Sequence, residues 1–350
     1  LTAGCGKEEG TPSAALSPLE TPVSVASPVS TPMMPVASLG LEPRIMFSSD
    51  RDGERRLYTM APDGTDVQPL DALNALAPKA LGWVSELQSF TALLNLDGQE
   101  DFYRIDVDGN VIQRLTTYPA DKNALMYSAV IEKFVFLCVQ VDLDICTVPL
   151  MGGEVINLTK TPMREFDPSW SPSDGRILFI SNRSGISDVW VMNHDGSGMK
   201  NLTHTGQPNA APSWSPDGSQ ILFTSQRDLN WEVYVMDANG KNPVNLTNNP
   251  HRDMTPRWSP DGKHIVFRSD RTGDDELYVI ASDGSGLTNV TNLSDSEEYV
   301  FTWSPDGERI LFVSDADGNY EIYSVNPDGQ DLVNLTQHPA SDTAPQWIYH

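Results

Sequence analysis

The sequence is poor in basic residues, and this shortage excludes two classes of partner. Its 350 residues include 23 lysines and arginines against 48 aspartates and glutamates, a formal net charge of −25 at pH 7. Such a chain is repelled by the phosphates of DNA and RNA and by an anionic membrane surface. We therefore expect neither a nucleic-acid partner nor electrostatic binding to lipid headgroups.

Long hydrophobic runs are also missing. No stretch of 18 consecutive apolar residues occurs, so no segment has the apolar length that a bilayer-spanning helix needs. The hydrophobic fraction, 39%, is nevertheless sufficient for a packed core in a chain of this length. The composition therefore indicates a globular protein.

Cysteine is scarce as well. Three cysteines are too few for a disulfide scaffold, and none belongs to a CxxC or Cys/His pattern that would indicate zinc. Cys138 and Cys146 lie in neighbouring predicted strands, on either side of a turn near Asp142. They could form a disulfide in an oxidising compartment, or they could remain two buried thiols.

The amino-terminal segment has a different character from the rest. Residues 1–5, Leu-Thr-Ala-Gly-Cys, resemble the end of a bacterial lipoprotein signal, and residues 6–41 are rich in Pro, Ser, Thr and Ala without hydrophobic periodicity. This pattern predicts lipidation of Cys5, followed by an extended tether. The protein would then be extracytoplasmic, anchored to a bacterial membrane in the periplasm or at the cell surface. The alternative is a non-native remnant with an unstructured terminus.

An internal repeat organises residues 42–350. Seven aromatic residues recur at intervals of 43 to 45 residues: Trp83, Tyr127, Trp170, Trp214, Trp258, Trp303 and Trp347. The best copies read Pro-Ser-Trp-Ser-Pro-Asp-Gly, followed by two short β-type segments and Asn-Leu-Thr. Asp-Gly pairs favour tight hairpins between the segments. Four short strands at this period are typical of the blades of a β-propeller.

The two ends of the repeat region complete one blade. Residues 44–70 match the last three strands of a repeat, whereas the segment around Trp347 matches a first strand with nothing after it. Joining them gives seven blades and removes the free sheet edges of an open array. The sequence therefore predicts an all-β, seven-bladed propeller of four-stranded antiparallel blades, which we expect to be a monomer.

The Pro-x-Trp-Ser-Pro-Asp-Gly motif resembles the WD40-like propeller repeat of the TolB type, related to the propellers of the dipeptidyl-peptidase-IV type. The resemblance covers residues 44–350; its clearest copies lie in residues 168–328, and the two copies in residues 81–159 are degenerate. TolB proteins combine six blades with an amino-terminal α/β domain. This chain departs from both features, so the resemblance implies the fold rather than a specific role.

Two sets of charged residues repeat with the blades. Acidic residues begin six of the third strands, and Arg51, Arg183, Arg227 and Arg271 end second strands across such hairpins, so we expect these two groups to form ion pairs. A second set begins the first strands, which line the channel of a propeller: Glu165, Asn209, Asp253, Glu298 and Asp342. These residues could attract a cation, or a partner's Lys or Arg, to the channel mouth. Alternatively, each acid accepts hydrogen bonds from its own loop.

One face of the propeller varies from blade to blade. We call it the variable face; it consists of the hairpins between second and third strands and the loops that lead into first strands. Its candidate binding residues, besides the channel-mouth set, are Tyr118, Trp231, His251, Arg252 and His338. Scaffold residues repeat because the geometry repeats, whereas a ligand rarely has sevenfold symmetry, so this face is the candidate binding surface.

Motifs for catalysis are missing from the sequence. There is no Gly-x-Ser-x-Gly elbow, phosphate loop or dinucleotide fingerprint. We therefore predict a non-catalytic scaffold that binds a protein or peptide, preferably a basic one, and that needs no cofactor beyond a cation at the channel mouth. The alternatives are a carbohydrate-binding protein, a structural module of an envelope complex, or a metal-dependent enzyme like oligogalacturonate lyase. An enzyme of that kind would have to build its metal site from Gln207, His251 and His338.

Overall fold

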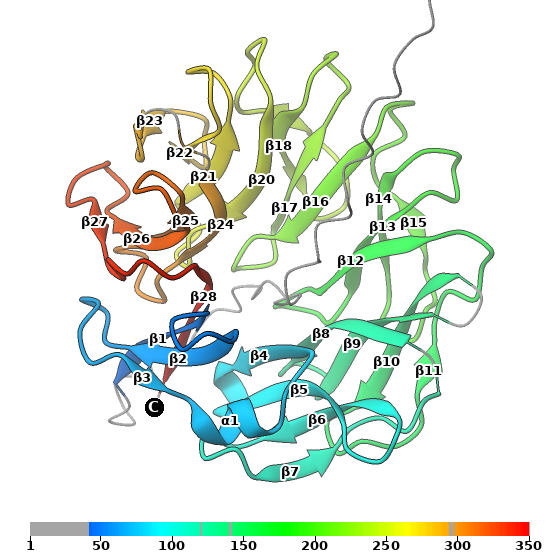
Figure 1. Ribbon diagram of the computed structural model, residues 1–350. Helices are drawn as coiled ribbons and strands as arrows, with labels where there is room; N and C mark the ends of the chain where they lie inside the picture. The colour runs from blue at the N-terminus through cyan, green and yellow to red at the C-terminus, as the bar shows by residue number, and fades with distance from the viewer. Residues whose placement is uncertain (1–41, 120, 140–141, 294–295, 297, 350) are drawn as a thin grey trace, which may run out of the picture.

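Seven four-stranded antiparallel sheets stand radially around a central axis (Figure 1). This architecture is seen in a computed structural model, which describes residues 42–119, 121–139, 142–293, 296 and 298–349. Cys5 and the predicted tether therefore lie outside the described residues. The prediction of an all-β, seven-bladed propeller is confirmed. No helix in the described ranges is long and apolar enough to cross a membrane.

We number the blades 1 to 7 along the chain, with blade 1 built from both of its ends. The innermost strands, from blade 1 to blade 7, are β28 (Asp342–Tyr349), β4 (Ala80–Val84), β8 (Asp121–Ser128), β12 (Glu165–Trp170), β16 (Asn209–Trp214), β20 (Asp253–Trp258) and β24 (Glu298–Trp303). The second strands are β1 (Pro43–Ser49), β5 (Ser89–Asn95), β9 (Lys133–Val139), β13 (Ile177–Ser181), β17 (Gln220–Ser225), β21 (His264–Ser269) and β25 (Ile310–Ser314).

The third strands are β2 (Arg56–Met60), β6 (Glu100–Ile105), β10 (Leu143–Pro149), β14 (Asp188–Met192), β18 (Glu232–Asp237), β22 (Glu276–Ala281) and β26 (Glu321–Val325). The outer strands are β3 (Gln68–Pro69), β7 (Val111–Arg114), β11 (Ile156–Asn157), β15 (Lys200–Asn201), β19 (Val244–Asn245), β23 (Thr288–Asn289) and β27 (Val333–Asn334). A short helix α1 (Asp71–Ala75) and a 3₁₀ turn η2 (Ser85–Leu87) lie in blade connections.

The hydrophobic core lies between neighbouring blades rather than within one sheet. In a typical seam, Leu178, Val189 and Val191 of blade 4 pack against Trp214 and Phe223 of blade 5. The repeated tryptophan is buried because it fills the seam towards the preceding blade; for example, Trp170 Nε1 donates a hydrogen bond to the carbonyl of Met126 (3.2 Å). Each blade thus needs both neighbours to bury its apolar faces, which favours a closed ring.

Pairing of β1 with β28 closes the ring, as predicted. Ile45 lies opposite Trp347 and Pro43 opposite Tyr349 in antiparallel register. In Figure 1 the two strands, blue and red, lie side by side although they come from opposite ends of the chain. Apolar side chains of blade 7 pack on blade 1, so closure combines backbone hydrogen bonds with a hydrophobic seam.

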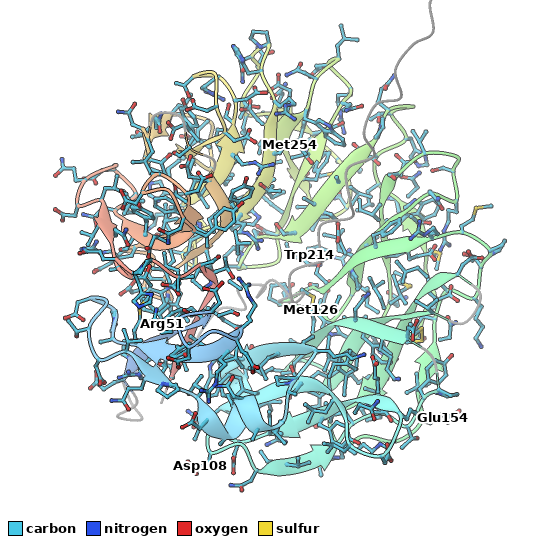
Figure 2. The ribbon with its side chains drawn as sticks, in the orientation of Figure 1. Arg51, Asp108, Met126, Glu154, Trp214 and Met254 are labelled. Atoms are coloured by element: carbon cyan, nitrogen blue, oxygen red, sulfur yellow. A yellow bond between two sulfur atoms is a disulfide. The ribbon has the colours of Figure 1, made fainter. Side chains whose placement is uncertain are left out.

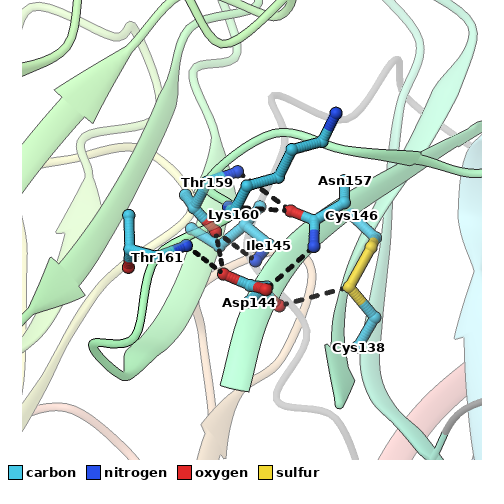
Figure 3. The surroundings of a disulfide bond; sticks show 8 residues. All are labelled: Cys138, Asp144, Ile145, Cys146, Asn157, Thr159, Lys160 and Thr161. Carbon is cyan, nitrogen blue, oxygen red and sulfur yellow. Dashed lines mark hydrogen bonds between the residues drawn. A yellow bond between two sulfur atoms is a disulfide. The ribbon is translucent and has the colours of Figure 1, made fainter. Parts of the chain in front are cut away.

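Blade 3 contains a disulfide between Cys138 in β9 and Cys146 in β10, with their Cα atoms 5.9 Å apart (Figure 3). Of the two alternatives left open by the sequence, the structure has the bridge. Both cysteines are fully buried.

The Ser-Pro-Asp-Gly motif forms the turn between first and second strands. In blade 5, Ser215 Oγ donates to Asp217 Oδ1 (2.6 Å), and Gly218 N donates to the carbonyl of Ser215 (2.8 Å). Gly218 has φ +73°, and a Cβ placed on it would lie 2.3 Å from Ser173 Oγ of the preceding blade. This repeated turn therefore requires glycine for both its backbone conformation and its close packing.

Candidate binding face

Backbone hydrogen bonds between blades hold the variable face together. Asp253 N, which begins an inner strand, donates to the carbonyl of Trp231 in the preceding blade's hairpin (2.8 Å). The same bond joins Asn209 to Ser187 (2.8 Å) and Asp342 to Tyr320 (2.7 Å). The hairpins and the inner-strand starts therefore form one connected surface around the channel mouth.

The channel-mouth residues are all buried. Glu165, Asn209, Asp253, Glu298 and Asp342 have exposed fractions of 0–1%. Arginines from the hairpins of the same blades compensate three of the four carboxylates: Arg183–Glu165 at 2.7 Å, Arg271–Asp253 at 2.8 Å and Arg51–Asp342 at 3.0 Å. For these three acids, an arginine of the same blade therefore already supplies the counter-charge. Whether any of the five contacts a ligand stays a prediction.

The predicted pairing of these arginines with third-strand acids is wrong. The third-strand acids are buried and accept hydrogen bonds from threonines just after the outer strands, as in Thr203 Oγ1 to Asp188 Oδ1 (2.7 Å) and Thr159 Oγ1 to Asp144 Oδ1 (2.8 Å, Figure 3). The same contact joins Thr116 to Asp101, Thr247 to Glu232, Thr291 to Glu276 and Thr336 to Glu321. These acids secure the outer edges of blades 2 to 7.

Two blades break the arginine–acid pairing in opposite ways. Blade 5 has Arg227 but carries the neutral Asn209 at the inner-strand position, and burial lowers the pKa of this arginine. Blade 7 has Glu298 but carries Ala316 where blades 1, 4, 5 and 6 have arginine. Burial, together with the negative charge of Glu276, raises the pKa of Glu298 to about 8. Glu298 is therefore largely protonated at neutral pH.

Three of the predicted binding residues come together between blades 5 and 6. Asn230 Nδ2 donates to the carbonyls of Asn249 (2.8 Å) and His251 (2.5 Å), which ties the blade 5 hairpin to the loop before β20. This contact places Trp231, partly exposed, beside the exposed His251 and Arg252. Arg252 Nε donates to Asp270 Oδ2 (2.7 Å), and this bond raises the pKa of Arg252.

The same hairpin presents an apolar residue that the sequence analysis missed. Leu229 is 97% exposed and has φ +85°, whereas the other described non-glycine residues with positive φ lie between 35° and 56°. The equivalent position in five other blades is glycine: Gly53, Gly98, Gly185, Gly273 and Gly318. That substitution is the sequence signal that could have revealed it. We call Leu229, Trp231, His251 and Arg252 the blade 5 patch.

The remaining predicted residues lie elsewhere on the variable face. Tyr118 is partly buried against the core shared by blades 2 and 3. His338 is partly buried in the loop before β28, where its Nδ1 accepts a hydrogen bond from Ala340 N (3.1 Å). Within the described part of the chain, no group of three or more His, Cys, Asp or Glu side chains is placed to hold a metal ion.

A cavity of about 590 Å³ occupies the channel beyond the mouth. Inner strands of all seven blades line it, mainly near their tryptophan ends, and none of the five channel-mouth residues does. In Figure 2 the lining residues Met126 and Trp214 lie towards the centre of the ring, whereas Asp108 and Glu154 lie at its rim. Asp167 projects into this cavity, where the surrounding protein raises the pKa of its carboxyl.

Comparison with known proteins identifies the repeat. Residues 207–300 match the family described as the TolB beta propeller domain. The chain is a TolB-like β-propeller. TolB from Acinetobacter baumannii superposes on it with a TM-score of 0.52 at 19% identity, over 72% of this chain and 65% of that one. No curated protein sequence gives a significant match.

Two enzyme groups share the fold with this TolB-like propeller. Oligogalacturonate lyase from Vibrio parahaemolyticus superposes with a TM-score of 0.66 at 15% identity, covering 87% of this chain and 92% of that one. A puromycin-hydrolyzing peptidase from Mycobacterium tuberculosis gives 0.65 at 14% identity, and the chain spans 56% of its length. Identities this low show a common propeller fold and leave the activity of the TolB-like chain to its own residues.

Proposed function

We propose that this TolB-like propeller is a non-catalytic scaffold that binds a protein or peptide partner through the blade 5 patch. The supporting observation is Leu229, a large apolar side chain held almost fully exposed at a backbone conformation that costs a leucine about 1–2 kcal/mol. Residues of this kind serve as anchors that enter a pocket of a partner. The partly exposed Trp231 and the exposed His251 and Arg252 would supply the aromatic neighbour and the polar rim of such an interface.

The hairpin is suited to this role because it is rigid. Arg227 N and Nε donate to Ser225 Oγ (3.3 and 3.0 Å), and Asn230 bridges to the next loop. Leu229 therefore projects from a preorganised support, which lowers the entropy cost of binding.

The proposed location is extracytoplasmic, with the protein anchored through a lipid on Cys5. The buried Cys138–Cys146 disulfide supports the compartment, because such bridges persist in oxidising surroundings. Incorporation of a labelled fatty acid by the native protein, lost in Cys5→Ser, is the expected result. Equal labelling of both proteins would contradict the anchor.

The binding test begins with capture of the partner from envelope fractions and continues with the purified pair. Leu229→Gly and Trp231→Ala should each raise Kd by at least about tenfold, as expected of interface anchors. Leu287→Gly is the matched control, because Leu287 is 45% exposed in a turn on the opposite face. An unchanged Kd for both patch variants would contradict the proposal. So would manganese-dependent cleavage of an acidic glycan by the purified protein.

A further inference from the structure

Four blades build the same cradle for an arginine at the end of the second strand. A serine two residues before the arginine accepts a hydrogen bond from its Nε at 2.9–3.0 Å, and the guanidinium lies 4.3–5.7 Å from the centroids of two aromatic rings. The arginines are Arg51, Arg183, Arg227 and Arg271. In three of these blades the guanidinium also meets the inner-strand carboxylate.

Blade 7 keeps the cradle but has no arginine. Phe312 and Tyr323 are stacked with centroids 5.4 Å apart, as the equivalent rings of blades 5 and 6 are, and Ser314 ends β25 at the serine position. The residue at the arginine position is Ala316, which is exposed. Blade 7 therefore retains the serine and the two aromatic rings that surround the guanidinium in the filled blades.

Glu298 completes the fourth side of the blade 7 cradle and has unused bonding capacity. Its Oε1 accepts hydrogen bonds from Ser296 Oγ (3.0 Å) and Ser314 Oγ (3.2 Å). Its Oε2 is fully buried and has no hydrogen-bond partner among the residues that the structure describes. In blade 1, Arg51 Nη2 bonds both oxygens of Asp342, at 3.2 and 3.0 Å, whereas in blade 4 Arg183 Nη2 bonds only Oε1 of Glu165, at 2.7 Å. A buried oxygen of this kind costs free energy until a donor reaches it.

We infer that the blade 7 cradle accepts an arginine side chain supplied by the partner, which would bind Glu298 as Arg51 binds Asp342. A guanidinium fits better than an ammonium, because it is planar, stacks on aromatic faces and offers parallel donors to a carboxylate. The three arginines that pair with inner-strand carboxylates have side chains that remain 13–17% exposed, so the position is within reach of the surface. This inference rests on the proposed function, since it specifies the chemistry of the protein partner.

The first experiment uses ethylguanidinium as a probe of the cradle, with ethylammonium as the matched cation. At equal millimolar concentrations, pH 8.5 and constant ionic strength, ethylguanidinium should raise the Tm by roughly 2 °C at about ten times its Kd, and ethylammonium should do so much less. Ala316→Arg fills the cradle from within the chain, and Glu298→Gln removes the carboxylate. Both variants should lose the response. Equal responses to the two cations, or a response that persists in Ala316→Arg, would overturn the inference.

The second experiment separates this inference from the proposed function. With the purified partner, Ala316→Arg should raise Kd about tenfold or more, because the introduced side chain competes with the partner's arginine. Replacing that arginine of the partner by lysine should have a similar effect. If Leu229→Gly weakens binding and Ala316→Arg does not, the proposed function stands and the arginine cradle is refuted.

Discussion

Because the pKa of Glu298 is raised in the folded protein, its contribution to stability decreases as the pH rises, which is opposite to the effect of a carboxylate whose pKa is lowered by folding. Its pKa is raised from 4.5 to about 8, because burial and the negative charges of Glu276 and Asp274 oppose ionisation. In the unfolded chain the pKa is ordinary, so the folded state holds the proton more tightly. The resulting stabilisation is complete below pH 4.5 and is lost as the pH rises through 8.

The magnitude follows from the size of the shift. One pKa unit corresponds to 1.36 kcal/mol, so this group alone should remove about 3 kcal/mol of the free energy of unfolding between pH 4.5 and pH 7. Glu298→Gln abolishes that dependence, because glutamine carries no titrating proton. Ala316→Arg should weaken it, since the arginine opposes the rise in the pKa of Glu298, as Arg183 does for Glu165.

Urea denaturation at pH 5, 6, 7, 8 and 9 measures the effect as a difference between variant and wild type. The free energy of unfolding of Glu298→Gln should increase relative to that of wild type as the pH rises, by about 3 kcal/mol between pH 5 and pH 8. Asp253→Asn in blade 6 is the contrasting variant. It leaves Arg271 without its carboxylate partner and should lower the free energy of unfolding by about 3 kcal/mol. A pH-independent difference for Glu298→Gln, or stabilisation by Asp253→Asn, would refute the reasoning.

Four further predictions concern the fold. Leu229→Gly should raise the free energy of unfolding by about 1 kcal/mol, measured by urea denaturation, because glycine tolerates the positive φ. Replacing Cys138 and Cys146 together by alanine should cost about 2–3 kcal/mol and make the Tm insensitive to reductant; a variant as stable as wild type would argue against the bridge. Deleting residues 342–350 should abolish cooperative unfolding, since it removes β28 and leaves β1 without its partner strand. Thr203→Val should destabilise by about 1–3 kcal/mol, since the buried Asp188 loses a donor.

The blade count and ring closure could be predicted from sequence because they depend on spacing alone. The interval between successive aromatic residues defines the blade, and the unmatched strands near Phe47 and Trp347 can only complete each other. The spacing of the repeat also placed Arg183 at the end of a second strand. It could not show whether Arg183 pairs with the inner-strand acid Glu165 or with the third-strand acid Asp188. The inner-strand Glu165 is the partner, because the arginine side chain turns inwards along its serine.

The binding face was less predictable, because its features are exceptions to the repeat rather than instances of it. Trp231, His251 and Arg252 could be assigned to one face, but their convergence depends on the Asn230 bridge between two loops. Leu229 and Ala316 become informative only when each is compared with the glycine or arginine at the same position in other blades. The exposure of Leu229 and the unused oxygen of Glu298 had to come from three-dimensional packing.

Ring closure by β1 and β28 also determines which way the molecule would face when it is attached to a support. The described chain enters the ring at Pro43, opposite Tyr349, on the face of the Ser-Pro-Asp-Gly turns. The blade 5 patch lies on the other face. A linkage through residues before Pro43, whether to a lipid or to a sensor chip, would therefore attach the propeller by the face of the Ser-Pro-Asp-Gly turns. Leu229 would then point away from the support.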